Sequence, residues 1–576
     1  MSQESSQVTG LTALLPGTVR LPGSNEYDSL TGSYFAQQGR LRPACYILPT
    51  SAEDVALAVK YLAQTPGAVF AIRASGTSPV AGAANIDNGI TIDLRRLNNV
   101  HLKGKIACIG SGASWSEVYN VLVPQGLICT RRKGGISTFS QEHGYACDSV
   151  VNMQVVLASG DIVDANEKEN PDLFAALKGG QHSFGIVTRF DLKTFDQGQY
   201  WGGAIQHPSS ANAIQLAALE TFLRTADPHA QIEQSFLFDT NAPDHGYSSN
   251  NMFYTKPVVD APAIRVFTEI QPQIHNSMRL GTLTEFSDEL SKYQPMDKHV
   301  NYATTTFRLR SDILSKVHAS WLKFASELQF PDVLAVLTLQ ALPPLSPTST
   351  NSLGFTPGSH PENDHVLCLF SNYWSASEHS ERVEAATWDA IGAIDSLAAK
   401  EGLGARYRYI NYAGKWQDPM KSYGDDVVEE LWRVSKKYDP EGVFQVKVPG
   451  GVQVAEARSQ IIKALVTANG AILERRNVNQ PTAGSESSME RKQSSATKRR
   501  LTSQDVGRKE IANLVAPAVL PHQSLLRDPP TISVATVSQN GSRSVLAVPS
   551  CPCAQAVIVC SIGLYKESSG SAKSPK

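Results

Sequence analysis

The chain has 576 residues, of which 41% are hydrophobic and 18% charged, and its formal net charge is −2. This length allows more than one domain, and the composition is ordinary for a globular enzyme. A nearly neutral chain has no overall electrostatic match to nucleic acid or to an anionic membrane, so we expect neither as a partner.

The eight cysteines show no CxxC pair and no His/Cys cluster with zinc spacing, so we expect no metal site. They are Cys45, Cys108, Cys129, Cys147, Cys368, Cys551, Cys553 and Cys560. Free cysteine is usually buried, and we interpret most of them as small core residues. One disulfide remains open if the protein is secreted.

The N-terminal segment, residues 1–36, is expected to form a mostly irregular arm. It has no basic stretch of the kind that opens a secretion signal, and its apolar run Leu11–Leu15 is short. A later apolar run, Ala554–Leu564, is too short to span a bilayer. The sequence therefore predicts a soluble cytoplasmic protein.

A helix and a strand–turn–strand follow. Thr50–Glu53 has the spacing of a capping box and predicts a helix through Val55–Val59. The apolar runs 68–72 and 90–94 predict buried strands on either side of a small-residue turn, 73–89. Such a turn can bring its backbone N–H groups close to a diphosphate, although it is equally compatible with an ordinary loop.

The next elements predict an α+β domain over residues 37–195. A strand at 106–109 precedes a helix at 115–122. Two strands between Val150 and Ala165 are joined by a turn at Ser159–Asp161. A short helix over 171–178 and a strand over 184–192 complete the domain.

The remaining chain divides into three parts. Residues 196–404 alternate long helical patterns, such as 211–224 and 380–400, with strand patterns at 333–340 and 365–370, and predict a sheet backed by helices. Residues 405–454 are rich in Tyr, Gly and Pro. Residues 455–576 lose the pattern and are expected to be a disordered tail, whose cluster Lys498–Arg500 is compatible with a localisation signal or an anion-binding patch.

Taken together, these motifs resemble the vanillyl-alcohol-oxidase superfamily with its p-cresol-methylhydroxylase-type FAD domain, and within it the fungal proteins similar to berberine bridge enzyme. The likeness covers about residues 25–454. The matching stretches are Leu41–Ser51, Arg73–Gly89, Gly144–Val151, Val155–Gly160, Asn170–Phe174, Phe184–Thr188, Tyr409–Tyr412 and Tyr438–Gln445.

The resemblance implies a two-part FAD-binding domain, completed by residues 405–454, beside the substrate domain at 196–404. It implies that FAD lies between these domains and accepts a hydride at N5 from a small organic molecule. Dioxygen is the expected electron acceptor, and secondary metabolism the expected setting. The oligomeric state is not readable from the sequence.

Two departures from the family pattern bear on the cofactor. Thr77 stands where relatives carry the histidine that is commonly bonded to the flavin, so we expect non-covalent FAD. Arg131–Lys133 run almost directly into Gly134, where relatives have a glycine-rich flavin loop. These cations are compatible with a diphosphate contact or with a solvated surface. The alternative to an enzyme is therefore a non-catalytic, degenerate member of the family.

The resemblance also assigns candidate site residues. Tyr412 is the candidate base, or else stacks on flavin or substrate, and Asn411 is a candidate partner of the flavin edge. The main-chain amides of 74–78 are candidate phosphate donors. The full set of candidate cofactor residues is Arg73, Ala74, Ser75, Gly76, Thr77, Ser78, Asp148, Val151, Gly185, Ile186, Val187 and Asn411.

Overall fold

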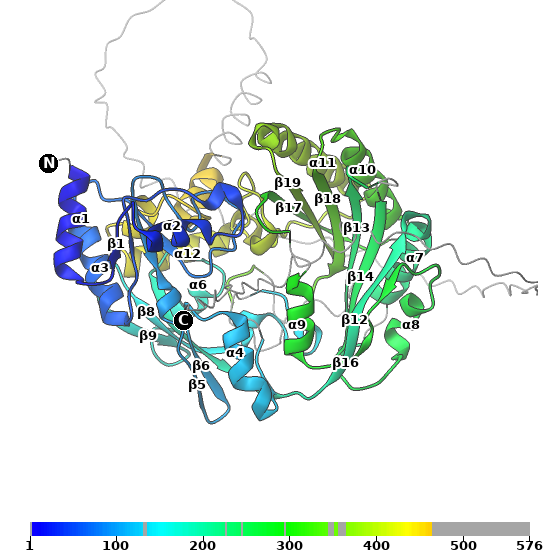
Figure 1. The fold of residues 1–576 in the computed structure, drawn as a ribbon, viewed down its shortest axis with the longest axis horizontal. Coiled ribbons are helices and arrows are strands. Elements are labelled where there is room, and N and C mark those ends of the chain that lie inside the picture. The colour runs from blue at the N-terminus through cyan, green and yellow to red at the C-terminus, as the bar shows by residue number, and fades with distance from the viewer. Residues whose placement is uncertain are drawn as a thin grey trace, which may run out of the picture. The chain divides into compact units, whose positions relative to one another are not determined.

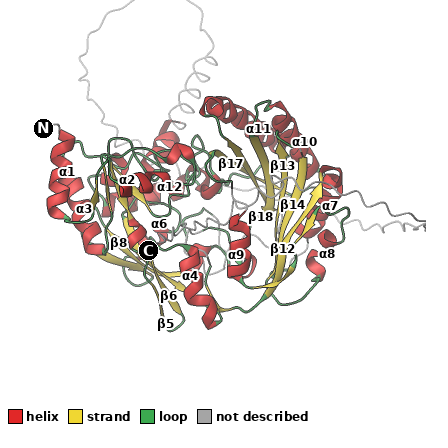
Figure 2. Ribbon diagram, viewed as in Figure 1, coloured by secondary structure: helices red, strands yellow, loops and turns green. Residues whose placement is uncertain are grey.

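The computed structural model describes residues 3–130, 135–224, 227–242, 246–292, 295–310, 312–343, 351–354 and 365–463. All of these residues belong to one unit of the chain. Figure 2 shows that helices and strands are mixed throughout this unit, as the α+β interpretation predicted. No helix within the described ranges has an apolar stretch long enough to cross a membrane.

A four-stranded sheet in the order β1-β2-β4-β3 opens the fold. Its strands are β1 (Val19–Arg20), β2 (Cys45–Ile47), β3 (Phe70–Arg73) and β4 (Ile90–Asp93). Both β2 and β3 run parallel to β4, and α3 (Ala52–Gln64) makes the crossover between β2 and β3. The cap of α3 is Ser51 rather than Thr50, because the Ser51 hydroxyl accepts the Asp54 N–H.

The prediction of an irregular N-terminal arm was wrong. Residues 3–14 form α1 (Gln3–Leu14), and Ser24 caps α2 (Asn25–Gly32). Leu11 and Leu15 are buried in the same apolar cluster as the inner face of α3. Because α1 is rich in Ser, Thr and Gln, only this sparse apolar spacing marks its buried face, and that signal is too weak to predict a helix.

A second, five-stranded antiparallel sheet has the order β5-β6-β10-β8-β9. Its strands are β5 (Val100–Lys103), β6 (Ile106–Gly110), β8 (Val150–Val156), β9 (Ile162–Asn166) and β10 (Ile186–Lys193). The hairpin β8–β9 confirms the predicted turn at Ser159–Asp161. A short pair, β7 (Leu127–Ile128) and β11 (Phe195–Asp196), lies outside this sheet.

Short helices accompany this second sheet. They are α4 (Trp115–Leu122), α5 (Ser140–His143) and α6 (Pro171–Leu177). The single turn η3 (Val123–Gln125) follows α4, and η4 (Ala146–Ser149) lies between α5 and β8. Two further turns border the first sheet, η1 (Gln37–Gly39) before β2 and η2 (Leu94–Arg96) after β4. The bounds of α4 match the prediction because a complete capping box, Ser114 with Glu117, begins the helix.

A large antiparallel sheet in the order β15-β12-β14-β13-β18-β19-β17, with β16 against β12, forms the second half of the unit. Its strands are β12 (Tyr200–Pro208), β13 (Ala230–Asp239), β14 (Gly246–Tyr254), β15 (His275–Asn276), β16 (Arg279–Gly281), β17 (His299–Arg308), β18 (Val333–Ala341) and β19 (His365–Trp374).

Helices cover one face of this sheet, as predicted (Figure 1). They are α7 (Asn212–Leu223), α8 (Pro262–Thr268), α10 (Ile313–Glu327) and α11 (Ser380–Lys400), with the single turns η5 (Ser209–Ala211) and η6 (Ser377–His379). The helix α9 (Leu283–Lys292) lies on the opposite face, near α4. Alternation along each strand therefore directs one set of side chains to the helices and the other toward the first half of the unit.

The last described segment returns to the first two sheets. It contains η7 (Ile410–Tyr412), η8 (Lys421–Tyr423), α12 (Asp425–Tyr438) and α13 (Val443–Val446). The Lys447 ammonium donates to the carbonyls of Leu62 and Ala63 at the end of α3. Residues 454–463 are helical and bury Val454 and Ile461, so the structured chain extends beyond the predicted limit at 455. The rest of the predicted tail, 464–576, lies outside the described residues.

Candidate functional site

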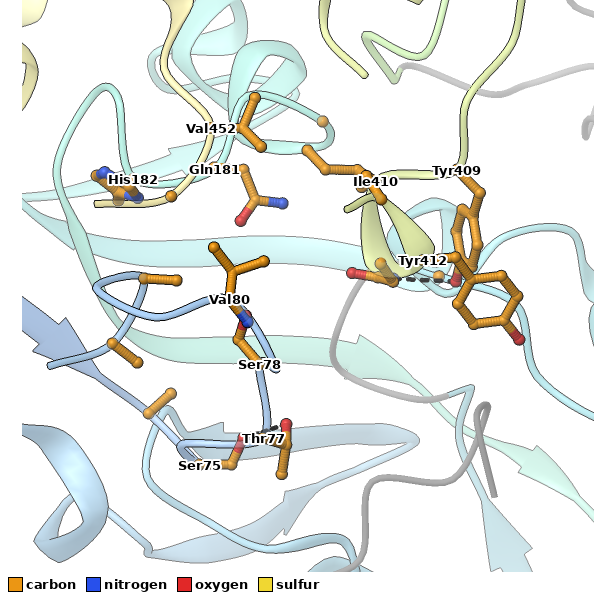
Figure 3. Close-up of a pocket in the computed structure, with 18 of the residues that line it drawn as sticks. Ser75, Thr77, Ser78, Val80, Gln181, His182, Tyr409, Ile410, Tyr412 and Val452 are labelled. Carbon is orange, nitrogen blue, oxygen red and sulfur yellow. Dashed lines mark hydrogen bonds between the residues drawn. The ribbon is translucent and has the colours of Figure 1, made fainter. Parts of the chain in front are cut away.

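A cavity of about 610 Å³ is lined by segments that are far apart in the sequence. Residues 74–80 of the predicted turn, the segment between α6 and β10, and the chain around η7 contribute most of its surface. Figure 3 shows Thr77 and Ser78 on one side and Tyr409 and Tyr412 on another. Cofactor and substrate sites in proteins commonly have this size.

The side of the cavity formed by residues 74–80 is called the turn wall. In the described part of the chain, the backbone N–H groups of Ser75, Gly76 and Ser78 have no acceptor. Gly76 has φ +71°, and a Cβ there would lie 2.8 Å from Arg73 Nε. Glycine therefore lets the chain bend without a clash and leaves amide donors facing the cavity, as an anion requires.

A second close contact holds the turn wall in place. A Cβ on Gly450 would lie 1.8 Å from the Gly82 carbonyl oxygen, so the C-terminal segment packs directly on the turn. Gly185, Ile186 and Val187 also line the cavity, and a Cβ on Gly185 would lie 2.7 Å from the Val156 carbonyl oxygen. The candidates at 74–78 and 185–187 are thus brought together around one space.

The structure places Arg73 behind the turn wall, which corrects the expectation of a cofactor contact. Its side chain is fully buried, donates to the carbonyls of Leu30 and Ser33, and lies 3.4 Å from the Asp93 carboxylate. The guanidinium also stacks 3.7 Å from the Tyr34 ring centre. Arg73 is therefore a support of the turn, because every direction around its side chain is filled by protein.

Asp148 and Val151 also lie outside the cavity lining. The Asp148 carboxylate accepts the Tyr145 N–H and the Asn351 amide, which ties η4 to a neighbouring loop. Val150 lines the cavity, and since side chains alternate along β8, Val151 points to the other face of the sheet. Both expectations of a cofactor contact are corrected by this placement.

Three tyrosines, Tyr302, Tyr409 and Tyr412, line another side of the cavity. This side is called the tyrosine wall. Tyr412 is 2% exposed, and the Gln340 amide donates to its hydroxyl oxygen at 3.0 Å. The Tyr409 hydroxyl accepts the Ile136 N–H at 2.7 Å and the Asn411 amide at 2.9 Å (Figure 3). Asn411 and Tyr412 are thus both held at the cavity, as predicted candidates.

Sequence reasoning missed several residues of the lining, above all Tyr302, Tyr409 and His182. Tyr409 precedes Tyr412 by three positions. In a single helical turn this spacing places two side chains on the same side, so the sequence could have predicted that Tyr409 lies at the cavity with Tyr412. Tyr302 comes from β17, and no motif around it in the sequence predicts a position at the cavity. Burial lowers the pKa of His182 to about 4, so this ring is neutral in the cavity wall at pH 7.

The shortened flavin loop that the sequence predicts at Arg131–Lys133 falls on residues 131–134, which lie outside the described ranges. Across the residues that are described, no group of three or more His, Cys, Asp or Glu could hold a metal ion. All five described cysteines are free and buried, as expected: Cys45, Cys108, Cys129, Cys147 and Cys368.

Comparisons with known proteins agree with this geometry. The model of the FAD binding domain family matches residues 43–166. The FAD-dependent monooxygenase drtC of Aspergillus calidoustus is 31% identical over 461 residues, covering 75% of this chain and 87% of drtC. The FAD-dependent monooxygenase tpcD of Cochliobolus heterostrophus is 32% identical over 498 residues, covering 77% of this chain and 93% of tpcD.

Solved structures show the same fold. For 6-hydroxy-D-nicotine oxidase from Arthrobacter nicotinovorans the TM-score is 0.63 at 20% identity, covering 75% of this chain and 96% of that enzyme. For a variant of berberine bridge enzyme the TM-score is 0.62 at 16% identity, covering 78% of this chain and all of that enzyme. The chain therefore belongs to the berberine-bridge-enzyme-like branch of the vanillyl-alcohol-oxidase and p-cresol-methylhydroxylase superfamily, and it is an FAD-dependent oxidoreductase.

Proposed function

We propose that this protein oxidises a small hydroxyl-bearing organic molecule with non-covalently bound FAD, in the biosynthesis of a secondary metabolite. The observation that carries the proposal is the pairing of two walls around one cavity: open amide donors on the turn wall and a held phenol, Tyr412, on the tyrosine wall. When bound, FAD supplies a hydride acceptor at N5 for a substrate C–H bond.

The turn wall suits the diphosphate of FAD. Ser75, Gly76 and Ser78 offer amide donors to its oxygens. Gly185, which also lines the cavity, has no side chain and therefore packs closely against Val156 of β8. Ile186, Val187 and Asn411 border the same space from two other segments. These residues would bind and orient the cofactor, while Arg73 keeps the turn in shape from behind.

The side chains available support the proposal of non-covalent binding. Glucooligosaccharide oxidase from Acremonium strictum, a structural relative at 19% identity, carries a 6-S-cysteinyl, 8α-N1-histidyl FAD. Here Thr77 shares a hydrogen bond with Ser75, and a hydroxyl is a poor nucleophile for such a bond. Burial raises the pKa of Cys129 to about 12, so this thiol stays protonated and unreactive.

Tyr412 is the proposed base for the substrate hydroxyl. The Gln340 amide donates to its phenolic oxygen, and this contact favours negative charge on that oxygen. The ring packs edge-on against Tyr409 with 4.7 Å between ring centres, which restricts its rotation. Tyr412 would hold the substrate oxygen and remove its proton, and dioxygen is the proposed final electron acceptor.

The test is the colour of the purified protein and of its acid precipitate. We expect a yellow protein with a flavin absorption band and a colourless pellet, because acid unfolds the turn wall and releases the flavin. A yellow pellet would contradict non-covalent attachment. Colourless protein that folds cooperatively and does not bind added FAD would favour the degenerate, non-catalytic alternative. Hydrogen peroxide released during turnover would support dioxygen as acceptor.

A further inference from the structure

Gln181 projects into the cavity from the segment between α6 and β10. Figure 3 shows its amide between Val80 of the turn wall on one side and Val452 and Ile410 on the other. The residue is exposed, and its amide makes no hydrogen bond to any residue that the structure describes. An amide that is open to a cavity, with its donors and its acceptor unused, is available to a ligand there.

The backbone at Gln181 is strained. The Ser183 N–H donates to the Gly180 carbonyl at 3.4 Å, so Gln181 is the first of the two central residues of a turn. Its φ is +57°, a left-handed conformation for which such a turn normally uses glycine. A glutamine in this conformation, at the wall of a cavity, indicates a functional constraint on the side chain.

The other left-handed residues sharpen this point. Besides Gln181, six non-glycine residues have a positive φ in the described ranges, and all six are Asn or Asp. Their short polar side chains can bond to the adjacent backbone, which makes the conformation less costly. The glutamine side chain is one methylene longer and makes no such bond. Hydrogen bonding within the described chain therefore does not offset the strain at Gln181, and what the residue adds over a glycine is an amide in the cavity.

The place of this amide indicates which part of FAD it contacts. The turn wall offers main-chain donors for the diphosphate, and η7, on the other side of Gln181, carries Tyr412, the proposed base. In FAD the ribityl chain joins the diphosphate to the flavin ring, and it carries hydroxyl groups. A neutral amide suits hydroxyls because it both donates and accepts, whereas it has no charge to offset a diphosphate.

We propose that the Gln181 amide binds the ribityl hydroxyl groups of FAD. This inference rests on the proposed function and deepens it, because it assigns a binding residue for the cofactor of the same site. The contact would hold the chain between the two walls and so orient the flavin ring relative to Tyr412. The strained turn directs the amide into the cavity before the cofactor binds, which reduces the ordering that binding requires.

The first experiment asks whether the Gln181 side chain stabilises the fold. Gln181→Gly and Gln181→Met are compared with the wild type by thermal unfolding of the full chain freed of flavin. We expect Gln181→Gly to raise the midpoint by about 1–3 °C, because glycine adopts φ +57° without strain. Gln181→Met keeps the strain, loses only the polar atoms, and should leave the midpoint unchanged. A lower midpoint for either variant would overturn the proposal.

The second experiment measures FAD affinity by fluorescence titration of the same proteins. Gln181→Gly and Gln181→Met should each weaken FAD binding about tenfold, the usual effect of losing one or two hydrogen bonds. Asn88→Gly is the matched control, because Asn88 has φ +58° and lies outside the cavity, and its FAD affinity should equal that of the wild type. If Gln181→Met binds FAD as tightly as the wild type, the proposal is wrong.

A third experiment locates the contact on the cofactor with ADP, which carries the diphosphate and adenosine of FAD but no ribityl chain. Competition with FAD measures its affinity, and we expect the same ADP affinity in the wild type and in Gln181→Met. Equal weakening of ADP and FAD would mean that Gln181 contacts another part of the cofactor, and would overturn the assignment to the ribityl chain.

These outcomes are separate from those of the proposed function. A yellow wild-type protein whose FAD affinity does not change in Gln181→Met retains its flavin role and loses only the assignment of Gln181. A wild-type protein that binds no FAD refutes the proposed function and the assignment together.

Discussion

The turn wall and the tyrosine wall border the same cavity but are built differently. The turn wall is one contiguous segment whose backbone faces the space, and its side chains are small. The tyrosine wall collects large side chains from β17 and η7, with Gln340 of β18 behind them. Main-chain amides can bind the diphosphate that every FAD molecule carries, whereas a particular substrate needs particular side chains. Substitutions at the turn wall should therefore affect cofactor binding and stability, and substitutions at the tyrosine wall should affect the reaction rate.

The largest effect is expected behind the turn wall. Arg73→Met should lower the free energy of unfolding by about 3–5 kcal/mol, because it removes a buried ion-pair partner of Asp93 and leaves the Leu30 and Ser33 carbonyls without their donor. Urea unfolding measures this loss. Arg95→Met is the control, since Arg95 also pairs with Asp93 but is partly exposed. Equal losses for both variants would refute the supporting role of Arg73.

On the tyrosine wall, a substitution of Tyr412 should lower the reaction rate and leave the amount of bound flavin unchanged. Tyr412→Phe is expected to slow flavin reduction by about 10²–10⁴-fold, the usual contribution of a positioned base, with flavin content unchanged. Stopped-flow absorbance with an oxidisable alcohol found by screening measures the rate. Tyr409→Phe provides the comparison, because its hydroxyl holds Ile136 and Asn411 and its loss should reduce flavin content instead. An unchanged rate for Tyr412→Phe would exclude it as the base.

Behind the large sheet, a histidine should make the stability depend on pH. Burial lowers the pKa of His318 to about 4 from an ordinary 6.5, so the folded state binds fewer protons than the unfolded state. This contribution is present above pH 6.5 and is lost as the pH falls toward 4, by at most about 3 kcal/mol. Urea unfolding of His318→Gln across this range should show a flatter pH profile, while exposed His101→Gln should not.

The smallest effect is expected from one methyl group on the turn wall. Gly76→Ala should cost about 1–2 kcal/mol in FAD binding, roughly tenfold in Kd, because a residue with φ +71° is strained when it carries a Cβ. Fluorescence titration of free FAD measures it. Gly17→Ala is the matched control, since Gly17 has φ +77° with open space around it and lies outside the cavity. A similar loss of FAD affinity in both variants would mean that strain acts on the whole fold.

Local signals explain which elements were predictable. The capping box at Ser114 and the long periodic pattern of α11 predicted bounds that the structure reproduces. The same reasoning failed for α1, whose buried face is marked only by widely spaced apolar residues among polar ones. It also placed the cap of α3 one residue early, because Thr50 and Ser51 are both acceptable caps and only the backbone geometry distinguishes them.

The turn, its glycine and the flanking strands could be predicted from the sequence alone, because these features depend on contacts between residues close together in the chain. The family motifs that made Tyr412 and Gly185 candidate site residues were equally readable, and both residues line the cavity. The position of Arg73 behind the turn, and the contact of Gln340 with Tyr412, became known only from the folded chain. Those contacts join residues far apart in the sequence, and strand register, which sets them, is established only when the sheet assembles.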